Sequence, residues 1–219
     1  MEKKYQLDDK LQFFHELLIQ MVNRVEEAIL LATKAFKDRD EKIAQKVVSD
    51  DYFIDQMRSL VESDGVHLLI SEAPYGQYMR QVIAGLKIVT SLERMGDHAA
   101  HLAAMAVMPV GGEEHTAVIN EIVEMALSDA KMTREAVEAM IHMDADKATA
   151  VAKLDDDIDQ RRQKINAMIL VLEPKDITER ENLYNYYYIA KELERLGDHV
   201  TNICAWIVYM VQGVKPDLN

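Results

Sequence analysis

The sequence has few of the residues that break a chain or cross-link it. Its 219 residues include one cysteine, Cys204, with eight glycines and four prolines. A single cysteine excludes an internal disulfide, which fits a reducing compartment. Few glycines and prolines, together with 49% hydrophobic residues, favour long uninterrupted elements, and helix is the element we expect.

The sequence also lacks a long apolar run. The longest is the nine-residue stretch Ile203–Val211, far short of the ~20 residues that cross a bilayer. The first thirty residues are charged and periodic and lack the apolar core of a signal peptide. We therefore expect a soluble, cytoplasmic protein.

Basic residues are in deficit, with 25 lysines and arginines against 38 acidic residues and a net charge of −13. Such a surface repels nucleic-acid phosphates and anionic lipid, so nucleic acid is excluded as a partner, but it attracts cations. The sequence contains no phosphate-binding glycine loop, no nucleophile–histidine–acid grouping and no cysteine pattern typical of zinc sites. We therefore do not expect an enzyme.

Apolar residues at three- and four-residue steps predict an all-α protein. The prolines fall outside these periodic segments, where they do least harm. Asp40 is a predicted N-cap, and Thr178–Glu181 has the form of a capping box. Six long helices are predicted. Five span about residues 6–37, 40–63, 114–142, 145–171 and 178–211, and the remaining one starts near residue 74 and includes the first copy of the heptapeptide described next.

One heptapeptide occurs twice: LERMGDH at Leu92–His98 and LERLGDH at Leu193–His199, 101 positions later. Other residues repeat at an offset of 104: Asp51 with Asp155, Asp55 with Asp159, and Asp40 with Asp144. A period near 100 residues indicates duplication of one three-helix unit. We predict two tandem pseudo-symmetric three-helix bundles, residues 1–110 and 111–219, divided at a segment that contains Pro109 and two glycines.

On a helical wheel the leucines of the heptapeptide fall in a core stripe, and Glu93 and Asp97 point to the other side. Two acidic residues one turn apart cost ~0.2–0.5 kcal/mol. A glycine within a helix, such as Gly96, costs roughly 1 kcal/mol relative to alanine. For one copy, a solvated acidic face and a close helix crossing explain these features. Their recurrence in register favours a hard cation bound by the carboxylates.

A second acidic row in each half completes the prediction, because two such rows on antiparallel helices would face each other and enclose one or more metal ions. The expected cofactors are divalent or trivalent metal ions. His98 and His199, which follow the aspartates, lie off these rows. Each could hold a metal ligand in place or be a surface residue, and we favour the surface interpretation, although His98 and His101 have metal-like spacing. The candidate ligands are Glu93, Asp97, Asp51 and Asp55, then Glu194, Asp198, Asp155 and Asp159.

The segments LKIVTSLERMGDHAAHLA and YYIAKELERLGDHVTNI resemble the paired signatures of PhoU-type phosphate-uptake regulators. The resemblance extends over nearly the whole chain. Two positions depart from the family pattern, since His101 replaces an asparagine and Met95 replaces an isoleucine. A histidine ligand would favour borderline ions such as iron, zinc or nickel.

The resemblance implies a cytoplasmic, all-helical negative regulator of phosphate uptake and of the phosphate regulon, often a homodimer. It implies partners as well: the ATPase subunit of a phosphate ABC transporter and a sensor histidine kinase, with membrane contact only through them. It further implies that the eight acidic residues named above hold the metal. Two alternatives remain open: a carboxylate-bridged metalloenzyme, although no Glu-x-x-His step occurs, and a metal-free helical adaptor of another phosphate transporter.

Overall fold

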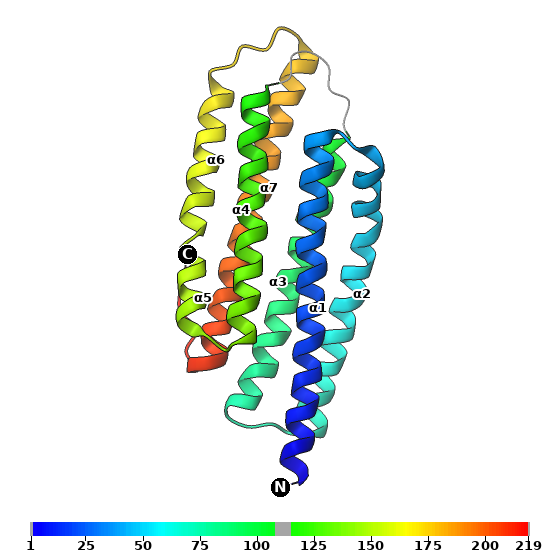
Figure 1. Ribbon diagram of the computed structural model, residues 1–219, viewed down its shortest axis with the longest axis vertical. Coiled ribbons are helices and arrows are strands. Elements are labelled where there is room, and N and C mark those ends of the chain that lie inside the picture. Colours follow the sequence, from blue (N-terminus) through cyan, green and yellow to red (C-terminus); the bar gives the residue numbers. More distant parts are fainter. Residues whose placement is uncertain (1, 108–114, 219) are drawn as a thin grey trace.

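The computed structural model describes residues 2–107 and 115–218, and over these ranges every regular element is an α-helix (Figure 1). This confirms the all-α prediction. The proposed division between residues 110 and 111, with Pro109, lies outside the described residues. The helices are α1 Glu2–Asp38, α2 Glu41–Ser71, α3 Gln77–Ala106, α4 Thr116–Ile141, α5 Ala145–Ala152, α6 Asp155–Leu170 and α7 Ile177–Gln212.

The fifth expected helix is divided into α5 and α6 by a turn at residues 153–154, which explains seven helices where six were expected. The second expected helix, α2, continues past residue 63 to Ser71. Gly65 lies inside this helix. It is buried, and a Cβ at this position would stand 2.8 Å from the Leu86 side chain of α3. The glycine marks a close helix contact.

Matched aspartates cap matched helices. The Asp40 carboxylate accepts hydrogen bonds from the Lys42 and Ile43 amides, and Asp144 accepts one from the Lys147 amide. The predicted cap at Asp40 is confirmed, and the 104-residue repeat extends to the start of α5.

The capping box of α7 lies two residues before the predicted one. Asp176 accepts from the Glu179 amide at 2.8 Å, while the Glu179 carboxylate reaches back to the Lys175 amide at 2.7 Å. Aspartate therefore takes the N-cap role that the sequence analysis gave to Thr178.

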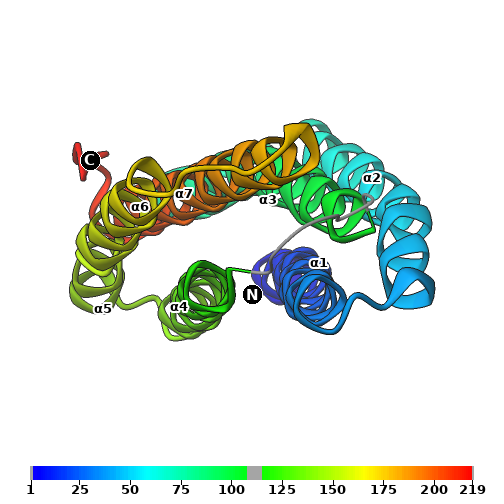
Figure 2. The same cartoon turned by 90° about the horizontal axis from the view of Figure 1, so that it is seen from above.

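The two heptapeptide-bearing helices, α3 and α7, lie side by side along the middle of the molecule (Figure 2). Helices α1 and α2 pack on α3, helices α4, α5 and α6 pack on α7, and α1 also contacts α4. One continuous core joins both halves, and its α3 and α7 stripes match the wheel prediction, with Leu92, Met95, Leu193 and Leu196 all buried. Among the described helices, none has the length and apolar content of a membrane span.

Candidate metal centres

The first acidic centre lies where α2 packs on α3. The charges of Asp97, Asp55 and Glu93 all act on Asp51 and, after burial, are the main causes that raise its pKa to about 6. The structure therefore brings together the four predicted ligands of the first half. Asp55 is exposed, Asp51 and Asp97 are partly exposed, and Glu93 is buried. The wheel placed Glu93 away from the core, and its burial against α2 corrects that expectation.

The second centre repeats this arrangement between α6 and α7. Burial and the charges of Asp198 and Asp159 raise the pKa of Asp155 to about 6. Burial and Asp159 also raise the pKa of Asp198. Repulsion among carboxylates is therefore a property of both halves, and a cation would relieve it in each.

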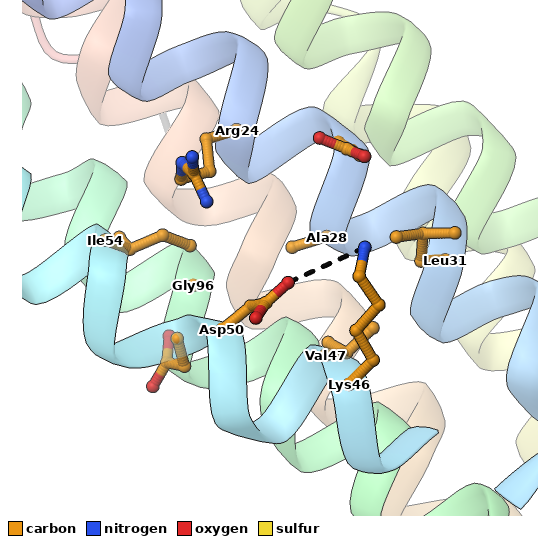
Figure 3. Close-up of a pocket in the computed structure, with 10 residues that line it drawn as sticks. Arg24, Ala28, Leu31, Lys46, Val47, Asp50, Ile54 and Gly96 are labelled. Carbon is orange, nitrogen blue, oxygen red and sulfur yellow. Dashed lines mark ion pairs between the residues drawn. The ribbon is translucent and has the colours of Figure 1, made fainter. Parts of the chain in front are cut away.

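The glycine of each heptapeptide makes room for an aspartate of the neighbouring helix. A Cβ on Gly96 would stand 2.9 Å from Asp51 Oδ1, and one on Gly197 would stand 2.4 Å from Asp155 Oδ1. Figure 3 shows Gly96 beside Ile54, whose Cδ1 would lie 3.0 Å from the same Cβ. The close helix crossing and the acidic centre are thus one feature, because the crossing places the aspartate against the glycine.

An arginine from the same helix as the aspartates neutralises one glutamate in each centre. Arg58 Nη1 donates to Glu93 Oε1 at 2.8 Å, and Arg162 pairs with Glu194 in the same way. The two arginines are 104 positions apart, like the aspartates of their rows. These arginines were not predicted from the sequence, although the shared pattern Asp-x-x-Ile-Asp-x-x-Arg contains the signal.

The second centre has a further carboxylate that the first lacks. Asp129 of α4 is fully buried, and neither of its oxygens has a hydrogen-bond partner among the described residues. Its Oδ1 lies 3.4 Å from the position of a Gly197 Cβ, near Asp155, and burial followed by the Asp155 charge raises its pKa well above the usual range. At the 104-residue offset that also relates Asp40 to Asp144, the matching residue is Val25, which is buried and apolar. In the first half a small cavity of about 20 Å³ lies beside Gly96 (Figure 3).

An oxygen-only donor set with an unpartnered buried carboxylate fits a hard cation. The rows are nevertheless open in this conformation. Among the described residues, no three of the predicted carboxylates bring one oxygen each within 4.8 Å of one another. A single ion would have to draw the rows together, whereas several ions bridged by carboxylates would fit a wider spacing.

The only described residues that meet that distance are His98, His101 and Glu192, between α3 and α7. His98 is buried, which contradicts its interpretation as a surface residue, and its ring stacks on that of His199 with centroids 5.4 Å apart. Burial and then the nearby His98 lower the pKa of His199 to about 4, so this ring is neutral at physiological pH. Glu192 was not selected from the sequence because it lies outside the heptapeptide.

Replacing Arg58 or Arg162 by glutamine is expected to have opposite effects on stability and on cation affinity. Loss of the pair with Glu93 or Glu194 lowers the free energy of unfolding of metal-free protein by about 1 kcal/mol. The same loss frees a carboxylate, so affinity for Mn²⁺ rises roughly fivefold (~1 kcal/mol). Denaturant unfolding with chelator and Mn²⁺ titration measure the two effects. Arg134→Gln, which removes an ion pair with Glu26 on α1, is the control, and weaker Mn²⁺ binding in both test variants would contradict the competition.

Taken together, these features define a class: all-α proteins made of two matched helical repeats, each with an acidic centre at a glycine-containing signature. The PhoU domain model matches residues 18–106 and again residues 122–207, so the chain belongs to the PhoU domain family.

Known relatives match the chain over almost its full length. A phosphate-specific transport system accessory protein PhoU homolog from Clostridium acetobutylicum is 31% identical over 97% of each chain. The crystal structure of the phosphate transport system regulatory protein PhoU from Streptococcus pneumoniae superposes with a TM-score of 0.88 at 28% identity, covering 96% of this chain and 99% of that one. The structure of PhoU from Pseudomonas aeruginosa gives 0.87 at 27% identity, covering 94% and 99%.

Proposed function

We propose that this protein is a non-enzymatic negative regulator of phosphate uptake and of phosphate-regulon signalling. The observation that carries the proposal is the match of both repeats, over nearly the whole chain, to proteins named as accessory or regulatory parts of a phosphate transport system. Its role is to hold partner proteins in a state that depends on phosphate supply. The proposed partners are the ATPase subunit of a phosphate ABC transporter and a sensor histidine kinase, contacted by the protein in the cytoplasm.

The outer face of α2 supports a docking role. Large apolar side chains are exposed along it, among them Tyr52 at 61% and Ile70 at 77% exposure. Exposed apolar residues that recur along one element are typical of protein interfaces. The net charge of −13 opposes direct contact with anionic lipid, so the membrane is reached through protein partners.

Within this role, we propose that the two acidic centres bind metal ions that fix the spacing of α2 against α3 and of α6 against α7. The bound ions would offset the burial and the carboxylate repulsion that together raise the pKa of Asp51 and Asp155. Ion binding would in this way set the shape of the faces that partners recognise.

The metal-free adaptor is the second candidate. Two observations favour it: the arginines that already pair with Glu93 and Glu194, and the open spacing of the carboxylates. In that case the centres would receive basic side chains of a partner. The two candidates share the regulatory role and differ only in what fills the acidic centres.

Deletion of the gene tests the regulatory role. In phosphate-rich medium we expect the deletion strain to express phosphate-starvation genes and to take up excess phosphate, and the wild-type gene to restore repression. Normal repression in the deletion strain would contradict the proposal. Affinity purification of the full chain from the same cells should recover the transporter ATPase or the kinase.

A further inference from the structure

The two signature helices make the same cross-contact twice, with different residues on each side. At an offset of 101, Ser91 matches Glu192 and Asn202 matches His101. On one side Asn202 Nδ2 donates to Ser91 Oγ at 2.8 Å. On the other side His101 Nδ1 lies 3.0 Å from Glu192 Oε2. The Asn–Ser pair shows that two neutral residues are enough for this helix contact. The His–Glu pair therefore calls for an explanation other than packing.

On the His–Glu side a second histidine nitrogen lies close to the same Glu192 oxygen. His98 Nδ1 lies 2.9 Å from Glu192 Oε2, and the three donor atoms all fall within 4.8 Å of one another. The Glu192 side chain is 2% exposed and that of His98 is 10% exposed. Donors on one tetrahedral ion at ~2.0–2.1 Å stand about 3.3 Å apart. The Glu192 oxygen is within a few tenths of an ångström of that spacing from each ring nitrogen.

The cluster is also accessible. It opens into a cavity of about 510 Å³ between α3 and α7, and the His101 side chain is 59% exposed at its mouth. An ion can enter from solvent, and a water molecule can take the remaining position. Two arginines, Arg94 and Arg195, and two aspartates, Asp97 and Asp198, also line the cavity, and Glu192 adds a third acidic group that favours a cation.

We propose that His98, His101 and Glu192 form a binding site for a transition-metal ion of the Zn²⁺ class at the junction of the two repeats. Its ligands differ from those of the acidic rows, although Asp97 and Asp198 of those rows line the same cavity. Two imidazoles and one carboxylate suit Zn²⁺, Fe²⁺, Co²⁺ or Ni²⁺, whereas Mg²⁺ prefers oxygen ligands. Each ring binds through Nδ1 and carries its proton on Nε2. Because His98 and His101 come from α3 and Glu192 from α7, the ion joins the two repeats directly.

The second side of the junction supplies a matched control within the same molecule. His199 corresponds to His98, but its neighbours are Asn202 and Ser91, which offer no comparable ligand set. Placing Asn and Ser on the His–Glu side should therefore remove the site. Placing His and Glu on the Asn–Ser side should create a second one, and the backbone of the junction already accommodates both pairs.

Co²⁺ titration of metal-free full-length protein, followed by visible absorption and by metal analysis, tests the proposal. We expect one equivalent of the bound Co²⁺ to show the visible bands of nitrogen ligation, in addition to any Co²⁺ held by the carboxylates of the acidic centres, and Zn²⁺ to displace it. His101→Asn combined with Glu192→Ser should weaken this binding at least a hundredfold. Ser91→Glu combined with Asn202→His should raise the number of such sites to two.

Two further measurements keep the test decisive. The single variant His101→Asn, at an exposed position, covers the case in which the double variant fails to fold, and it should weaken Co²⁺ binding at least tenfold. Asp51→Asn with Asp155→Asn should leave the Co²⁺ site unchanged, which separates it from the acidic rows and from the proposed regulatory function. Identical Co²⁺ spectra for wild type and His101→Asn would overturn the proposal.

Discussion

Replacing Asp51 and Asp155 together by asparagine is expected to stabilise the metal-free protein at pH 7.5, by roughly 1–2 kcal/mol for each replaced group after allowance for partial exposure. Each aspartate has its pKa raised from 3.8 to about 6 in the folded protein. At pH 7.5 both groups are charged in a site that disfavours the charge, and the neutral amide removes that cost while keeping the size of the side chain.

The same shifts give the wild-type protein a characteristic pH dependence. The folded protein takes up a proton at each aspartate as pH falls below about 6, whereas the unfolded chain does so only near 3.8. Relative to the double variant, the free energy of unfolding of metal-free wild type should therefore rise as pH falls from about 6 to about 4, and these two groups should oppose folding fully above pH 6. The comparison cancels the opposite effect of His199, whose pKa of about 4 destabilises both proteins over the same range.

Denaturant unfolding with chelator, repeated with saturating Mn²⁺, measures both effects. Mn²⁺ should stabilise the wild type and have little effect on the double variant, so the order of stability reverses when metal is added. A double variant that is less stable than wild type without metal would show that the aspartates stabilise the fold, contrary to this account. Asp40→Asn, at the cap of α2, controls for the loss of an acidic group elsewhere.

Gly197→Ala is expected to lower Mn²⁺ affinity in the second repeat at least tenfold, with a smaller loss for Gly96→Ala in the first. The added Cβ would stand 2.4 Å from Asp155 Oδ1 in the second repeat, against 2.9 Å from Asp51 Oδ1 in the first. Oδ1 of buried Asp129, which lies 3.4 Å from the same Cβ position, also limits where the displaced Asp155 carboxylate can go. The aspartate must leave the position in which it faces the other carboxylates.

The stability of these glycine variants is not expected to follow their affinity. Alanine favours a helix by roughly 1 kcal/mol over glycine, which offsets part of the steric cost. Mn²⁺ titration of each variant, with the other repeat inactivated by the matching Asp→Asn change, isolates one centre at a time. Equal Mn²⁺ affinities for Gly197→Ala and wild type would contradict the role assigned to the glycine.

The sequence predicted the features that depend on local periodicity and on duplication. Apolar spacing predicted the core stripes of α3 and α7. The repeated heptapeptide and aspartates indicated which carboxylates lie near enough to raise the pKa of Asp51, while metal binding by them stays a prediction. Apolar spacing is a property of a single helix, and the repeated residues lie 101 or 104 positions apart in the sequence. Neither feature requires knowledge of tertiary packing.

The features that the sequence did not reveal depend on packing between helices. Asp129 is a single acidic residue on α4, and only the fold shows that it is buried beside Asp155. Glu192 looks like a surface residue until α7 is placed against α3, where it meets His98. Arg58 and Arg162 were recognisable as a matched pair, but their glutamate partners lie on other helices.

Elemental analysis of full-length protein tests the central claim most directly, provided that it is purified without chelators or a histidine tag. The His101→Asn plus Glu192→Ser background removes the junction site, so the metal that remains reports on the acidic centres alone. The account predicts at least one metal ion for each repeat in this background, and loss of that metal on adding Asp51→Asn and Asp155→Asn. Protein without stoichiometric metal, or metal that survives those two substitutions, would contradict it.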